Sequence, residues 1–252
     1  MYPVLAEIGP YTIHSYGLFV ALGSALGIWI WEDEVKQKGL QSSLLPGLAL
    51  LCLLAWLVGA RTAFLLQQPW ILLQDPALAL YFWRGGLNLW AGAIPASLVL
   101  TLGLRLHRQS LLSWADALAP GLAAGLAVGH IGCFLSGAGH GKPTDLPLSV
   151  VYTRIESLAP IYVPLHPTQL YYSLAAVLAY ILLNLSRSRA ARQGQILGLF
   201  LAVYFVLYMV ISMLRGDDQL LLWGLIWQQW VSALLAGLGL YIYTQGKEQK
   251  HA

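Results

Sequence analysis

The sequence predicts an all-α polytopic membrane protein with seven transmembrane helices, and three observations support this prediction. The 252 residues are 58% hydrophobic and only 10% charged, whereas an average soluble domain has about 25% charged residues. The mean hydropathy is +0.65. Seven apolar runs are long enough to cross a hydrocarbon core of about 30 Å, which takes about 20 helical residues. The runs lie near residues 15–31, 44–66, 88–105, 114–135, 167–186, 195–214 and 223–244.

The lysine and arginine residues predict the orientation of these spans, because such residues are retained on the cytoplasmic side. The basic residues of every second connection mark one face as cytoplasmic, which places the N-terminus outside and the C-terminus inside. They are Lys36, Lys38, Arg105, Arg108, Arg187, Arg189, Arg192, Lys247 and Lys250. The other basic residues lie within a helix or on the outer side, where this rule does not require them. They are Arg61, Arg84, Lys142, Arg154 and Arg215.

The order of apolar and polar segments predicts one seven-helix membrane domain over residues 1–244, followed by a polar cytoplasmic tail over 245–252. Residues 1–13 and 67–86 are expected to lie along the outer membrane surface as amphipathic arms. Residues 136–166 form the one sizeable extramembrane segment and contain a strand-like run. We therefore expect a small external head with some β structure between the fourth and fifth helices.

Composition and local chemistry limit the function classes. The net charge of +3 is small and its basic residues are scattered, which argues against a nucleic-acid partner. Cys52 and Cys133 lie in apolar segments with neither disulfide nor metal-ligand spacing, so no metal or cofactor is expected. Asp116, near the start of the fourth helix, suits the N-terminal turn of that helix and is assigned a structural role.

The segment Gly125–Thr144 carries the most specific chemistry of the chain. It begins as a helix rich in small residues, contains His130, and then becomes a loop with His140 between several glycines. Glycines such as Gly137 and Gly141 allow backbone amides to approach a ligand closely. Ionisable groups at membrane depth are costly and suggest a function. The alternative is that the histidines bond to neighbouring helices and the glycines only permit tight packing.

Polar residues gather at the predicted outer ends of five helices. They are His14, Tyr16, Arg61, Arg84, Trp90, His130, His140, Lys142, His166, Gln169 and Arg215. Gly59 is expected to leave room for an anion beside Arg61. Cations at headgroup depth between apolar helices predict the binding of phosphatidylglycerol or another anionic phospholipid. A transporter or channel remains an alternative, although polar groups through the whole membrane depth are not evident.

Six sequence blocks resemble, in order, the phosphatidylglycerol–prolipoprotein diacylglyceryl transferase family, and they extend over nearly the whole chain. The blocks are Ile8-Gly9-Pro10 with His14-Ser15-Tyr16-Gly17, Gly59-Ala60-Arg61, Trp83-Arg84-Gly85-Gly86, Gly129 to Thr144, His166-Pro167-Thr168-Gln169-Leu170-Tyr171, and Leu214-Arg215-Gly216-Asp217-Asp218. The resemblance implies transfer of a diacylglyceryl group from phosphatidylglycerol to the lipobox cysteine of a prolipoprotein, whose signal peptide would be a partner. It also implies a multi-pass protein of the bacterial plasma (inner) membrane whose active side faces outward.

The resemblance assigns roles to individual residues. It implies a base that generates the thiolate, cations that hold the departing phosphate, and a slot for the acyl chains. The candidate catalytic residues are Tyr16, His130, His140 and His14. The candidate substrate-binding and phosphate-binding residues are Arg61, Arg215, Lys142, His166, Gln169, Gly137 and Gly141.

Several positions depart from the pattern of the family. The family usually has His at Trp90, Arg at His130, Arg and Glu at Tyr208 and Ser212, and two cysteines or an acidic residue around Ala138. Guanidinium grips phosphate with two parallel hydrogen bonds, whereas imidazole near neutral pH is mostly uncharged. Two interpretations stay open. Either the chain is a transferase with a rearranged site, or it binds an anionic phospholipid without transfer or acts on a different thiol or lipid.

Overall fold

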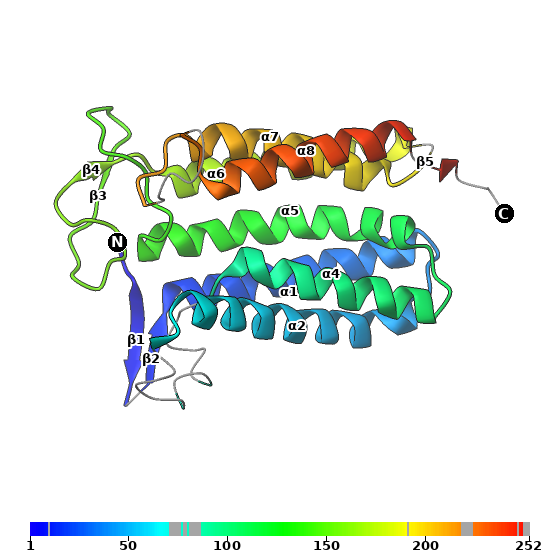
Figure 1. Cartoon of the computed structure of the whole chain (residues 1–252), viewed down its shortest axis with the longest axis horizontal. Helices are drawn as coiled ribbons and strands as arrows, with labels where there is room; N and C mark the ends of the chain where they lie inside the picture. Colours follow the sequence, from blue (N-terminus) through cyan, green and yellow to red (C-terminus); the bar gives the residue numbers. More distant parts are fainter. Residues whose placement is uncertain are drawn as a thin grey trace. The chain divides into compact units, whose positions relative to one another are not determined.

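A computed structural model describes residues 1–9, 11–70, 77, 80, 87–190, 192–217, 224–245 and 247–248. Within these residues the chain forms seven helices of 18 residues or more (Figure 1). They are α1 (Ser15–Gln37), α2 (Leu45–Gln67), α4 (Leu89–Leu106), α5 (Leu111–Ser136), α6 (Thr168–Ser186), α7 (Gln195–Ser212) and α8 (Trp227–Gln245). The predicted all-α membrane fold is confirmed. Arg84, Asp218 and most of the arm predicted at 67–86 lie outside the described residues.

Not all seven helices are equally apolar. Five have the length and composition to cross a membrane: α1, α2 together with the short 3-10 helix η1 (Ser42–Leu44) before it, α5, α6 and α7. In α4 the apolar stretch Trp90–Leu106 is shorter. The helix α8 falls below this standard and opens with Gln228 and Gln229, which are both buried. The seven predicted helices are therefore all present, and five or six of them are apolar enough to be membrane spans.

The chain divides into two compact units, one of which is Val35–Trp114. In this unit α2 packs along α4. The contact is close because Gly59 faces the ring of Pro95, and Gly92 faces the backbone of Trp56. The room expected beside Gly59 for an anion is thus filled by Pro95, and this glycine serves helix packing.

The other unit comprises Met1–Glu34 and Ala115–Ala252. Small residues bring its helices together, as is common in membranes, where apolar burial alone does not drive helix association. A Cβ added to Gly23 of α1 would lie 2.5 Å from the carbonyl oxygen of Gly125 in α5. Gly198 of α7 and Gly239 of α8 face each other in the same way. Figure 1 shows α6, α7 and α8 side by side in this unit.

Asp116 has a different role from the one predicted. Its carboxylate accepts hydrogen bonds from the backbone N–H groups of Gly194 at 2.7 Å and Leu197 at 2.8 Å. These groups belong to the N-terminus of α7, whose first N–H groups have no partner within the helix. The residue is structural, but it caps α7 instead of the N-terminal turn of its own helix.

Three two-stranded antiparallel sheets complete the described fold. The predicted outer arm at 1–13 is a β-hairpin of β1 (Val4–Ile8) and β2 (Tyr11–His14), so His14 ends a strand and does not start α1. The predicted head contains β3 (Val150–Val151) paired with β4 (Pro164–Leu165), which confirms its β structure. In the third sheet β5 (Arg192–Gln193) pairs with β6 (Lys247–Glu248), and the 3-10 helix η4 (Arg187–Arg189) precedes β5.

Candidate functional site

Three backbone segments meet where α5 ends, α6 begins and α7 ends. The loop segment 140–144 lies between residues 214–216, which follow α7, and residues 164–166, which precede α6. On one side the Lys142 N–H donates to the carbonyl of Leu214 at 2.7 Å. On the other side the His166 N–H donates to the carbonyl of Lys142 at 3.0 Å. Residues far apart in the sequence are thereby held in one place by main-chain hydrogen bonds.

Two of the glycines predicted to bind substrate make this backbone arrangement possible. A Cβ on Gly141 would lie 2.5 Å from the carbonyl oxygen of His166, so no larger residue fits between the paired segments. Gly137 follows the last turn of α5 with a φ of +85°, where its N–H donates to the carbonyl of Cys133. This is the left-handed helix ending that favours glycine. The alternative interpretation of these glycines, as packing residues, agrees with their geometry.

Arg215 is the cation that this framework positions best. Its Nε and Nη2 donate to the two carboxylate oxygens of Asp217 at 3.1 Å and 3.0 Å. Its Nη1 donates to the Tyr208 hydroxyl at 3.3 Å. A Cβ added to Gly139 would lie 3.9 Å from the guanidinium, which places this part of the loop directly beside Arg215. Arg215 is therefore arranged as in an anion-binding site, with the Asp217 carboxylate in the place of the anion.

His130 lies in a buried aromatic group that the sequence did not predict. Its Nε2 and the hydroxyl of Tyr204 are 3.1 Å apart, within hydrogen-bond distance. Its ring stacks on Tyr172 at 5.2 Å between centroids, and Tyr172 stacks on Tyr208 at 4.4 Å. The position at which the resemblance implies an arginine thus holds a histidine within hydrogen-bond distance of a phenol.

His140 is the candidate base with the clearest geometry. It is buried, and its Nδ1 lies 3.1 Å from the carbonyl oxygen of Gly141. Since a carbonyl oxygen can only accept, Nδ1 must carry the proton in this contact. In the neutral ring Nε2 is then the unprotonated nitrogen, which is the one able to take a proton from a thiol.

Lys142 and His166 have different surroundings. The Lys142 ammonium donates to the carbonyl of Met213 at 2.8 Å, at the C-terminus of α7, where a cation is favourable. His166 is partly buried and its ring meets Tyr171 edge-on. Its Nδ1 is buried without a hydrogen-bond partner among the described residues. Of these two predicted phosphate ligands, Lys142 binds the C-terminal end of α7, whereas Nδ1 of His166 has no hydrogen-bond partner among the described residues.

Gln169 connects the site to the external head. Its Nε2 donates to the carbonyl of Ala138 at 3.0 Å and to the Tyr152 hydroxyl at 3.4 Å, and that hydroxyl donates to the carbonyl of Phe134. Because the Ala138 carbonyl can only accept, these contacts fix the orientation of the Gln169 amide. Its Oε1 is buried without a partner in the described part of the chain. Burial raises the pKa of Tyr152 to about 12, so its phenol stays protonated and can keep donating.

Tyr16 and Cys133 lie on the two helices that approach each other at this end. A Cβ on Gly132 of α5 would be 3.3 Å from the carbonyl oxygen of Tyr16 in α1. Cys133 directly follows Gly132 in the last turns of α5. His14 is exposed at the end of β2. Tyr16 therefore lies beside the part of α5 that also carries the Cys133 thiol.

Two predicted residues lie in the other unit, Val35–Trp114. Arg61 is buried on α2 with its guanidinium 5.4 Å from the centroid of the Phe64 ring. Trp90 is the second residue of α4, just after the N-cap Asn88, whose side chain accepts from the Ala91 N–H. The joint action of Arg61 and Arg215 on one phosphate remains a prediction.

The changed family positions share one property, which is the absence of charge. Tyr208 and Ser212 are both buried on α7, as expected for two residues four apart on a helix. The Ser212 hydroxyl donates to the carbonyl of Met209 in its own helix. Ala138 contributes only its backbone, which Gln169 holds.

Asp217, Tyr152, Tyr172 and Tyr204 are the residues that sequence reasoning missed. Asp217 stands two residues after Arg215, so an alternative partner for this arginine was visible in the sequence. The three tyrosines gave no such signal, because a tyrosine in an apolar helix or strand is usually a packing residue. No group of three or more His, Cys, Asp or Glu side chains in the described part of the chain is arranged to hold a metal ion.

Comparison with known proteins adds independent information. A family model described as prolipoprotein diacylglyceryl transferase matches residues 3–245. A phosphatidylglycerol–prolipoprotein diacylglyceryl transferase of Bordetella parapertussis is 31% identical, over 96% of this chain and 95% of its own length. Proteins of the same description from Clostridium tetani and Nitrosomonas europaea are each 27% identical, over 99% of this chain and 100% and 93% of their own lengths.

Proposed function

Because the chain belongs to the prolipoprotein diacylglyceryl transferase family, we propose that it transfers the diacylglyceryl group of phosphatidylglycerol to the lipobox cysteine thiol of a prolipoprotein. The observation that carries the assignment of the site is the placement of Arg215 on backbone-paired segments, next to the loop that carries His140. The family match favours this activity over a transporter or channel.

The proposed reaction exchanges a carbon–oxygen bond for a carbon–sulfur bond. The thiol gives its proton to a base, and the sulfur attacks the glyceryl carbon that carries the phosphate ester. The carbon–oxygen bond breaks, and glycerol phosphate leaves with the electron pair. Nε2 of His140 is the base that this geometry favours, since its Nδ1 is already committed to a carbonyl. Arg215, together with Arg61, would stabilise the negative charge on the departing phosphate.

The proposed location is the bacterial plasma membrane, with the head segment 136–166 facing outward. The support is the basic residues in every second connection, which the positive-inside rule places in the cytoplasm. The exposed position Asp145 offers a test. An Asp145→Cys variant in intact cells should react with a membrane-impermeant maleimide added outside. Labelling only after the cells are broken would reverse the proposed orientation.

Reconstitution tests the activity. Protein in nanodiscs containing phosphatidylglycerol, given a lipobox peptide, should yield a diacylglyceryl peptide detectable by mass spectrometry. Arg215→Gln should lower kcat/KM by about 10²-fold or more, as for a lost transition-state donor, and His140→Gln by about 10²-fold. Arg105→Gln and His107→Gln remove the same groups from exposed positions of the other unit and should leave the rate unchanged.

A second candidate function is lipid binding without transfer, because the occupied donors of Arg215 leave less stabilisation for the charge that develops on a departing phosphate. The three guanidinium nitrogens of Arg215 all have partners within the chain, and Nε2 of His130 lies against the Tyr204 hydroxyl. Protection of the Cys133 thiol from maleimide by phosphatidylglycerol, without product, would support this function. Trp90→His combined with His130→Arg introduces the two residues that the resemblance implies. This double variant should raise the rate of diacylglyceryl transfer if the fold is intact and only these site residues have changed. Unchanged activity would contradict that account of the two positions.

A further inference from the structure

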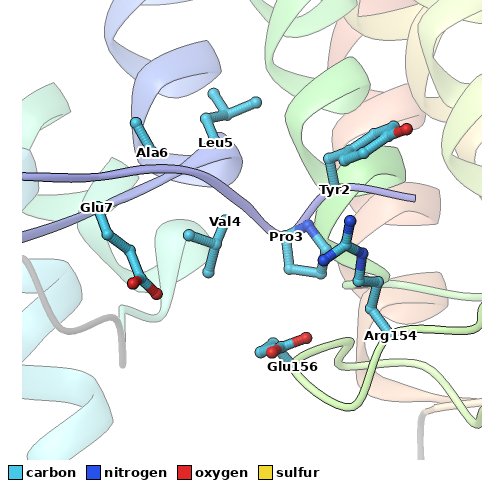
Figure 2. A pocket seen from close by; sticks show the side chains of 8 residues that line it. All are labelled: Tyr2, Pro3, Val4, Leu5, Ala6, Glu7, Arg154 and Glu156. Atoms are coloured by element: carbon cyan, nitrogen blue, oxygen red, sulfur yellow. The ribbon is translucent and has the colours of Figure 1, made fainter.

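A separate pocket lies along the N-terminal strand, outside the group of residues assigned to catalysis. It has a volume of about 440 Å³. Its walls are the consecutive residues Tyr2–Glu7 and two residues of the head, Arg154 and Glu156 (Figure 2). The proposed reaction uses none of these residues.

The lining shows that the pocket reaches the edge of β1. Side chains of a strand alternate between its two faces, so a pocket on one face would be lined by every second residue. Here every residue from Tyr2 to Glu7 contributes. Figure 2 shows Val4 and Glu7 on one side of the strand and Leu5 and Ala6 on the other, in agreement with the irregular register between Val4 and Ala6. Among the described strands β1 pairs only with β2, so no described strand pairs with its second edge, where an extended peptide could add as a further strand.

The charges of the pocket favour a cationic guest. The Arg154 guanidinium lies 5.4 Å from the centroid of the Tyr2 ring in a cation–π contact, and the lining as a whole keeps one net negative charge because it also contains Glu7 and Glu156. The exposed carboxylates of Glu7 and Glu156 lie on the same side of the strand in Figure 2. A lysine or arginine side chain between them would find two negative charges.

Hydrogen bonds connect both walls of the pocket to residues next to or among the site candidates. On the head side Tyr152, two residues before Arg154, is bonded to Gln169. On the strand side the carbonyl of Pro3 accepts hydrogen bonds from the backbone N–H and the hydroxyl of Ser15, the residue before Tyr16. A chain held in this pocket is therefore bound by segments that also position the reaction.

We propose that this pocket binds an extended segment of the acceptor polypeptide as an added strand along β1, with a lysine or arginine of that segment between Glu7 and Glu156. The inference rests on the proposed function, which supplies a polypeptide substrate. It assigns to the hairpin and the head a role in selecting the acceptor by sequence beyond the lipobox.

The test compares labelled lipobox peptides that differ in a flanking segment of about six residues: absent, neutral, or containing one lysine. Binding is measured by fluorescence anisotropy and, separately, transfer by mass spectrometry. The lysine peptide should bind about fivefold more tightly than the neutral one, as expected for partly exposed charge pairs. Glu7→Gln with Glu156→Gln should abolish that difference. Asp145→Asn removes a carboxylate of the same head outside the pocket and should preserve it.

N-methylation of single residues along the flanking segment tests the strand pairing. In a paired strand every second N–H points to the partner strand, so binding should fall at alternate positions only. Equal effects at all positions, or equal binding of the three peptides, would overturn the inference. If the three peptides bind equally but are still modified, the proposed function is supported and only the inference about the pocket fails. If binding depends on the lysine but no product forms, the proposed function is contradicted and the pocket inference is not.

Discussion

Replacement of Asp217 by asparagine tests whether the negative charge beside Arg215 limits the binding of a phosphate. In the structure the Asp217 carboxylate occupies two donors of Arg215, at 3.1 Å and 3.0 Å. A lipid phosphate seeking the same donors must displace this carboxylate or share it. Asparagine keeps the shape of the side chain but removes its negative charge. We therefore expect Asp217→Asn to bind phosphatidylglycerol more tightly than the native protein.

The exposure of the pair sets the size of the effect. The Arg215 side chain is 14% exposed and the Asp217 side chain 25%, so water screens the pair partly. A charge-assisted pair in such surroundings contributes about 1–2 kcal/mol. Removing the competing charge should thus strengthen phosphatidylglycerol binding by about fivefold to thirtyfold. Binding of a zwitterionic phospholipid should change much less.

The assay uses a thiol that the chain already carries. Cys133 is partly buried in the last turn of α5, directly before the loop that pairs with residues 214–216, so a bound headgroup should slow its reaction with maleimide. A Cys52→Ser background removes the only other cysteine. The concentration of phosphatidylglycerol that gives half-maximal protection should fall in Asp217→Asn, and it should stay unchanged in Asp145→Asn. Weaker protection in Asp217→Asn, with an unchanged melting temperature, would refute the reasoning and show that Asp217 orients Arg215 for its ligand.

Two further substitutions test the packing that supports the site. Gly125→Ala should destabilise the protein by about 1–3 kcal/mol, because the added methyl meets the backbone of Gly23. Gly129→Ala, in the same helix with nothing within 4 Å of the added methyl, is the control, and equal melting temperatures of the two variants in detergent would contradict the close contact. Asp116→Ala should cost about 2–4 kcal/mol, because the N–H groups of Gly194 and Leu197 lose their acceptor. Asp116→Asn keeps one acceptor and should cost less, so an Asn variant as unstable as the Ala variant would argue against the cap.

Length and hydropathy were enough to predict the number and positions of the helices, because both are properties of single segments. The predicted spans agree with the observed helices to within a few residues at most boundaries, including the start of α6 at Thr168. The order of the six sequence blocks also indicated the family. The β-hairpin at residues 1–14 was missed because two short strands with a proline between them carry little periodic signal.

The partners of the polar residues could not be predicted in this way, because a hydrogen bond depends on which atoms face each other across the fold. The sequence offered Lys142, Arg215 and Gly141 equally as ligands for phosphate. In the structure Lys142 donates to a carbonyl at the end of α7, Gly141 packs against the backbone of His166, and Arg215 binds the carboxylate two residues away. Asp116 likewise caps a helix some 80 residues further along the chain. Such pairings follow from how the segments meet in space, which no local pattern specifies.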